Sequence, residues 1–154
     1  MSYDSTDSTE KHISRVVQLI NIVQMNLIKR AQEHDRSKLG DVEKPIFDEF
    51  TCKLKGSTFG SPEYNEFLKE MKVALDHHYM VNDHHPDHFK DGIKGMNLIS
   101  LLELICDWKA ASERHDDGDI MQSLEINQKR FNYSDELKEI FKNTILFFKE
   151  QEKN

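Results

Sequence analysis

Apolar residues recur at helical spacing over long stretches of this chain, and this periodicity is what most limits its fold. Between residues 11 and 33 no glycine or proline interrupts the pattern. The apolar positions of this stretch include Ile13, Val16, Val17, Ile20, Val23, Leu27, Ile28 and Ala31. Side chains three and four residues apart lie on one face of an α-helix, so the stretch predicts one long amphipathic helix.

The rest of the chain repeats this pattern in shorter segments, separated by the few glycines and prolines. Helices are predicted around 45–54, 62–81, 97–115, 119–130 and 135–150. The six Gly and three Pro are too few for a turn-rich β fold. We therefore predict an all-α fold, a compact bundle of five to seven helices. It forms a single domain over residues 10–154, after a flexible N-terminal tail of residues 1–9.

The charge of the chain excludes some partners. The net charge is −7 with histidine counted as neutral, whereas a free-standing nucleic-acid binder usually presents a basic face. Sequence-independent binding to DNA or RNA is therefore not expected. An acidic protein can still bind a small phosphate ester where a metal ion supplies positive charge locally.

No segment of the sequence predicts export or membrane insertion. Residues 1–9 lack the apolar stretch of a secretory signal, and no apolar run approaches the roughly 20 residues of a transmembrane helix. Cys52 and Cys106 have no CxxC spacing and are expected to be reduced thiols. These features predict a cytoplasmic protein without a membrane partner.

Five of the eight histidines fall within the segment HHYMVNDHHPDH, at His77, His78, His84, His85 and His88. Neutral imidazole is the most common metal-binding side chain, so the segment predicts a set of metal ligands, with His77, His78, His84 and His85 as candidates. His78 favours this interpretation because it continues the apolar face of its helix, where a buried imidazole needs a partner. The alternative is a polar loop that is rich in histidine.

An adjacent His-Asp pair, His34 and Asp35, stands at the predicted end of the first helix. Such a pair at the end of a buried helix can supply an imidazole and a carboxylate to the same cation. Lys38 follows three residues after Asp35 and is a candidate catalytic residue that receives an anionic oxygen. Arg36 is a candidate substrate-binding residue, since its charge would also neutralise an anion.

A single carboxylate, Asp107, interrupts the apolar helix predicted over 97–115. Burying it is costly unless it is paired or coordinates a metal. Glu103 lies one turn earlier on the same stripe, and Arg114 lies seven residues later. One interpretation is a structural network of these three residues. The other is that Asp107 completes the metal site, while Glu103 holds a ligand or acts as a catalytic residue that moves protons.

Lys109 and Arg114 are also candidate substrate-binding residues. Together with Trp108, Asn127 and Arg130, they are predicted to line a pocket that contacts a phosphate or a base. At helical spacing, a tryptophan such as Trp108 is more often part of the core.

The order of these elements resembles the HD superfamily, which includes metal-dependent phosphohydrolases. HDRSK is similar to the HDxxK form of its motif, and HHPDHFKDGI is similar to the HHE-plus-Gly segment of its phosphodiesterase branch. The resemblance implies an HD-like helical domain in which His, His-Asp and Asp ligands bind one divalent cation and further histidines recruit a second. Mn, Ni, Zn, Fe and Mg are the candidate metals.

One part of the HD pattern is missing, the histidine ligand upstream of the His-Asp pair. His12 is the only upstream histidine. At 1.5 Å per residue, an unbroken helix places it about 33 Å from His34. We therefore expect His12 to be a surface residue near the start of the helix. The long helix could also pair with a copy of itself in a homodimer, which would allow His12 to serve across the interface.

Nearly the whole chain, from His12 to Thr144, also resembles a family of uncharacterised phage and bacterial proteins. The matching segments are HDRSKL, TFGSPEY, ALDHHYMVNDHHPDHF, GMNLISLLELICDWKAASERHDDGDI and SLEINQKRF. This second resemblance implies no particular reaction.

Three functions fit these features. The first is a metal-dependent phosphohydrolase that acts on a nucleotide or another small phosphate ester. The second is an oxygenase, because HD scaffolds can also hold two irons. The third is a small acidic interaction protein, for instance a phage product that acts on a host component, with a structural metal or none.

Overall fold

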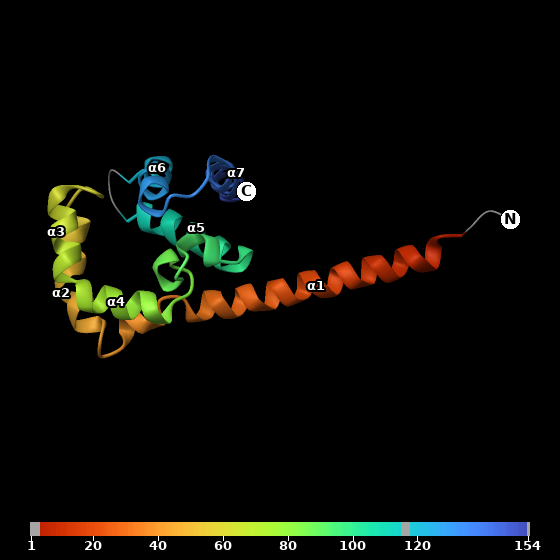
Figure 1. Cartoon of the computed structure of the whole chain (residues 1–154), viewed down its shortest axis with the longest axis horizontal. Helices are drawn as coiled ribbons and strands as arrows, with labels where there is room; N and C mark the ends of the chain where they lie inside the picture. Colours follow the sequence, from red (N-terminus) through yellow and green to blue (C-terminus); the bar gives the residue numbers. More distant parts are fainter. Residues whose placement is uncertain (1–3, 115–117, 154) are drawn as a thin grey trace. The chain divides into compact units, whose positions relative to one another are not determined.

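The computed structural model describes residues 4–114 and 118–153. Within these residues the chain forms seven α-helices, three short 3₁₀ helices and no strand, which confirms the predicted all-α fold. The α-helices are α1 (Thr6–Glu33), α2 (Lys44–Lys55), α3 (Pro62–Glu70), α4 (Lys72–Val81), α5 (Leu98–Ser112), α6 (Ile120–Phe131) and α7 (Asp135–Gln151) (Figure 1). The 3₁₀ helices are η1 (Arg36–Leu39), η2 (Pro86–His88) and η3 (Gly92–Gly95).

Contacts divide the chain into two compact units, residues 1–34 and 35–154. The first unit is essentially α1, a helix of 28 residues. This helix begins at Thr6, inside the segment predicted to be a tail and before the predicted start near residue 11. The side chain of Asp4 explains the earlier start, because its Oδ1 accepts a hydrogen bond from the Thr6 backbone N–H at 3.0 Å.

The single helix predicted over 62–81 is two helices in the structure. α3 and α4 meet at Met71, whose side chain is fully buried. Backbone hydrogen bonds continue on both sides of the bend, from Met71 N–H to the Phe67 carbonyl and from Leu75 N–H to the Met71 carbonyl. No glycine or proline marks this position, so we attribute the bend to the packing of Met71, which helical spacing alone does not reveal.

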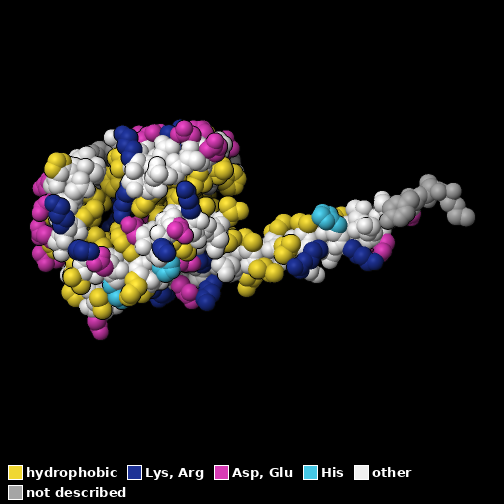
Figure 2. All heavy atoms as spheres, in the orientation of Figure 1, with side chains coloured by type: hydrophobic (Ala, Val, Ile, Leu, Met, Phe, Trp, Pro, Cys, Tyr) yellow, Lys and Arg dark blue, Asp and Glu magenta, His cyan; other side chains and the backbone are white. Residues whose placement is uncertain are grey.

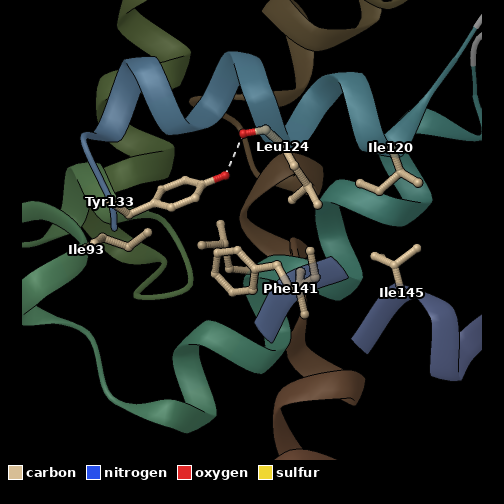
Figure 3. Packing of buried hydrophobic residues seen from close by; sticks show 8 residues of the cluster. Ile93, Ile120, Leu124, Tyr133, Phe141 and Ile145 are labelled. Atoms are coloured by element: carbon tan, nitrogen blue, oxygen red, sulfur yellow. Dashed lines mark hydrogen bonds between the residues drawn. The ribbon is translucent and has the colours of Figure 1, made fainter. Parts of the chain in front are cut away.

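The hydrophobic core of the second unit lies among α5, α6 and α7 (Figure 3). Its buried residues are Ile93, Leu104, Ile105, Ile120, Leu124, Tyr133, Phe141 and Ile145. The Tyr133 hydroxyl donates a hydrogen bond to the Leu124 carbonyl oxygen at 2.6 Å, so the polar tip of this ring is satisfied inside the core. Trp108 packs against the same cluster, as expected for a tryptophan at helical spacing.

Capping side chains fix where the helices of the second unit begin. The predicted cap Asn97 accepts hydrogen bonds from the backbone N–H groups of Ile99 and Ser100 at the start of α5. Ser134 caps α7 in the same way, by accepting from Leu137 N–H. α5 ends at Ser112, and residue 115, the predicted last residue of this helix, lies outside the described residues.

Charged side chains are spread over the visible face of the second unit (Figure 2). Among residues 4–114 and 118–153, no helix has both the length and the apolar character that crossing a membrane requires.

Candidate metal centre

Four side chains of the second unit converge on one small volume: Asp35, His78, His84 and His85. One ligand atom of each residue lies within 4.8 Å of the ligand atoms of the other three. Asp35 Oδ1 is 3.2 Å from His78 Nε2 and 3.4 Å from His84 Nε2. The Nε2 atoms of His78 and His85 are 2.9 Å apart.

These separations are those of ligand atoms that share one cation. Around a metal whose ligands stand near 2.1 Å, adjacent donor atoms are about 3.0 Å apart in octahedral geometry and about 3.4 Å apart in tetrahedral geometry. Three imidazole nitrogens and one carboxylate oxygen also suit Zn, Mn, Fe or Ni chemically. The arrangement therefore fits a divalent metal ion.

Asp35 has an unusual backbone conformation. The residue directly precedes η1 and has a φ of 57°, in the left-handed region that residues other than glycine seldom occupy. Aspartate tolerates this region better than most residues, and such conformations concentrate at functional sites. Lys38 of η1 holds the second carboxylate oxygen, with Nζ 2.5 Å from Oδ2.

The electrostatic surroundings keep Asp35 ionised. Burial raises the pKa of its carboxyl, but the contacts with His78, His84 and Lys38 outweigh burial and hold the pKa below its ordinary value. Asp35 is thus a carboxylate, the form in which this side chain binds a metal.

His78, in the last turn of α4, contacts a buried carboxylate through the ring nitrogen that does not face the cluster. His78 is 1% exposed, and its Nδ1 lies 2.9 Å from Oε2 of Glu43, which is fully buried. Since a carboxylate accepts, Nδ1–H donates, and Nε2 presents its lone pair to the cluster. Histidines that bind a metal through one ring nitrogen commonly donate the N–H of the other ring nitrogen to a carboxylate.

Sequence reasoning missed Glu43. It stands directly before α2, and its only local signal is an acidic residue in front of a predicted helix. The same carboxylate also accepts from His77, whose Nδ1 is 2.7 Å from Glu43 Oε1. His77 therefore lies on the far side of Glu43 and not among the four converging residues.

His84 has a similar support. Its side chain is 3% exposed, and its Nδ1 lies 3.1 Å from Oε1 of Glu103 on α5. With this nitrogen donating to Glu103, His84 Nε2 faces Asp35. Glu103 is thus placed to hold a candidate ligand, one of the two roles considered for it from the sequence.

His85 and Asp107 complete the group. Burial, together with the neighbouring imidazoles of His84 and His78, lowers the pKa of His85 to about 3, so this imidazole is neutral and able to bind a metal. Asp107 on α5 brings a carboxylate oxygen within 4.8 Å of the ligand atom of Asp35. The lone aspartate of the apolar helix therefore lies beside the cluster.

The remaining predicted site residues are His34, Arg36, Lys109 and Arg114. His34 is the last residue of the first unit, one peptide bond before Asp35. Arg36 is exposed in η1, and Arg114 is exposed just beyond the end of α5. Lys109 is buried, and its Nζ contacts Glu113 and lies 2.8 Å from Glu152 Oε1, so its charge links the ends of α5 and α7.

Residues 1–152 match the model of a protein family. The chain belongs to the family of unknown function DUF5662. No curated protein and no solved structure matches it. The match confirms the resemblance to an uncharacterised family, and any activity of this DUF5662 member has to be argued from its own residues.

A cavity of about 210 Å³ in the DUF5662 chain adjoins the cluster. His85 and Asp107 form part of its wall, so the cavity and the converging ligands are continuous. Three residues that the sequence predicted to line a pocket are on this wall: Trp108, Asn127 and Arg130. Lys109 and Arg114 are not among its described wall residues.

Proposed function

We propose that this DUF5662 protein is a metal-dependent phosphohydrolase of the HD kind, acting on a nucleotide or another small phosphate ester. The observation that carries the proposal is the convergence of Asp35, His78, His84 and His85 within 4.8 Å. Two carboxylates support it further, the fully buried Glu43 at His78 and the partly buried Glu103 at His84, because they resemble the outer ligand shell of metal enzymes. The adjoining cavity offers a place for a substrate.

The divalent ion, with Mn, Ni, Zn, Fe and Mg as candidates, would be held by these four residues. Asp107 lies beside the cluster. His34, adjacent to Asp35 in the sequence, is a further candidate ligand through its resemblance to the HD motif alone. When bound, the metal would lower the pKa of a coordinated water and polarise the phosphoryl oxygens.

The protein's own side chains then have distinct tasks. Lys38, whose Nζ is 2.5 Å from Asp35 Oδ2, would neutralise charge on a phosphoryl group at the cluster. Glu103 would orient the His84 ring by accepting from His84 Nδ1. Arg36 remains a candidate for phosphate binding, but the ammonium of Lys109 already contacts two carboxylates. Lys109 is therefore the weaker of these two candidates.

Hydrolysis is expected to depend on added metal. Chelator-treated protein is assayed for phosphate release from nucleoside mono-, di- and triphosphates and from p-nitrophenyl phosphate, with each of the five metals in turn. Activity should return with at least one metal. Lys38→Ala should lower kcat roughly tenfold, about the effect of one charge-assisted hydrogen bond. Lys44→Ala removes an exposed lysine that also pairs with an aspartate, Asp48, and should leave kcat unchanged.

A protein that binds metal but releases phosphate from none of these compounds would contradict the proposal. A coloured, iron-containing preparation that consumes oxygen would instead favour the di-iron oxygenase. A protein without metal and without activity would favour the interaction protein.

We also propose that the chain forms a homodimer through α1. The apolar residues Ile13, Val16, Ile20, Val23 and Leu27 alternate by three and four positions, which is the spacing of a coiled-coil seam. This seam runs along about 21 Å of helix. None of the side chains of α1 is buried, so a second copy would cover an apolar stripe.

Light scattering coupled to size exclusion is expected to give twice the monomer mass for the wild-type chain. The double substitution Ile20→Glu with Val23→Glu puts two like charges into the seam of each copy and should give a monomer. Gln18→Glu with Asn21→Glu adds the same charge outside the seam and should remain dimeric. A wild-type monomer at tens of micromolar would contradict the dimer.

A further inference from the structure

The cavity beside the cluster has a wall rich in aromatic rings. They are Phe59, Tyr64, Tyr79, Trp108 and Phe131, drawn from the segment before α3 and from α3, α4, α5 and α6. Its volume of about 210 Å³ is below the roughly 300–1,000 Å³ of pockets that enclose a drug-sized ligand. The cavity therefore fits one small, flat group better than an extended ligand.

The charges on the wall decide which part of a phosphate ester can enter. Three carboxylates border the cavity, those of Asp87, Asp107 and Asp119. Among the described wall residues Arg130 is the one cationic side chain, and its Nη2 is 3.3 Å from Asp87 Oδ2. A phosphate inside would meet an excess of negative charge, so the cavity favours an uncharged group, and the phosphate belongs at the metal cluster.

Asn127 on α6 is the most informative residue of the wall. It is 4% exposed, and among the described residues its side-chain amide has no hydrogen-bond partner. The amide atoms of Asn127 are not among the described side-chain atoms that are both fully buried and without a partner, so they are accessible from the cavity. A ligand bound in the cavity would therefore find a donor and an acceptor that no protein group occupies.

We infer that the cavity binds a nitrogen heterocycle of the nucleobase type, with the Asn127 amide hydrogen-bonded to the edge of the ring. A carboxamide offers a donor and an acceptor side by side, which matches the neighbouring acceptor and donor on a base edge. Aromatic side chains on the wall stack on the faces of such a ring. The inference rests on the proposed function only in placing the phosphate of the substrate at the metal cluster.

Calorimetric titration of the metal-free protein tests this inference without requiring hydrolysis. Adenosine, guanosine, cytidine and uridine are the probes, and ribose is the probe that lacks the ring. At least one nucleoside should bind, and ribose should not. Asn127→Leu should weaken nucleoside binding at least tenfold without lowering the midpoint of thermal unfolding, because it replaces an unpartnered amide by an apolar side chain of similar size. Asn143→Leu, the same change at an exposed position of α7, should leave the affinity unchanged.

Asn127→Asp serves as a second variant, since it keeps the shape of the side chain but removes the donor, and it should also weaken binding. Failure of all four nucleosides to bind at millimolar concentration would overturn the inference, as would equal binding by the wild type and both variants. Nucleoside binding without phosphate release from any nucleotide would keep the heterocycle site and reject the phosphohydrolase. Hydrolysis of p-nitrophenyl phosphate without nucleoside binding would keep the phosphohydrolase and reject the heterocycle site.

Discussion

Protein purified without a histidine tag is expected to carry about one or two equivalents of a divalent metal, and the double variant Asp35→Asn with His78→Gln is expected to carry almost none. These substitutions remove the carboxylate and one of the three imidazoles whose ligand atoms lie within 4.8 Å of one another. Mass spectrometry of the elements in each preparation measures the difference.

Chelation should also lower the midpoint of thermal unfolding of the wild type by about 10 °C. A metal that binds only the folded state stabilises it by about 4 kcal/mol at a thousandfold excess over Kd, and about 2–4 °C accompanies each kcal/mol at this chain length. The double variant should have the same midpoint of thermal unfolding with and without chelator.

The matched control is Asp7→Asn with His12→Gln, the same two chemical changes at exposed positions of α1. This control should keep its metal. A folded Asp35→Asn, His78→Gln protein with undiminished metal would show that the ion binds elsewhere. The wild type could instead contain no metal and keep the same midpoint of thermal unfolding with chelator. That result would mean that the histidine cluster is a polar network and would favour the interaction protein.

The helices were predictable because their signals are local. The six predicted helical segments overlap all seven α-helices of the described residues, and the caps at Asn97 and Ser134 fixed two starts. The bend at Met71 was not predictable, since no residue there breaks a helix and the cause is packing between segments. The early start of α1 at Thr6 depends on one side chain, Asp4, within a segment whose composition suggests a tail.

The candidate site was predictable in composition but not in detail. The density of histidines pointed to the segment that supplies His78, His84 and His85. Helical spacing put His78 on the apolar face, but His77 stayed among the candidate ligands. Adjacent residues on a helix point about 100° apart, and in the structure His78 faces the cluster whereas His77 does not. The support from Glu43 was invisible for another reason: it lies 35 residues before His78, and only tertiary structure brings them together.

Glu43→Gln is expected to weaken metal binding about 10- to 100-fold while the fold persists, the usual cost of losing the support behind a ligand. Glu43 is fully buried and accepts from both His77 and His78. Glutamine fills the same space but is neutral and brings its own N–H donors, so at most one of its terminal atoms can accept. His77 and His78 then share one uncharged acceptor, which holds the proton on His78 Nδ1 and the lone pair on Nε2 less strongly than the carboxylate does.

Competition with a chelator of known affinity measures this loss, and two further variants interpret it. Glu49→Gln makes the same change at an exposed position of α2 and should bind metal like the wild type. His77→Gln removes the other partner of Glu43 and should change the affinity much less than Glu43→Gln, because the contact of His78 with Glu43 remains. Equal affinities for Glu43→Gln and the wild type would mean that the buried carboxylate only joins α2 to α4. A large loss in His77→Gln would place His77 among the ligands and move the centre of the site toward Glu43.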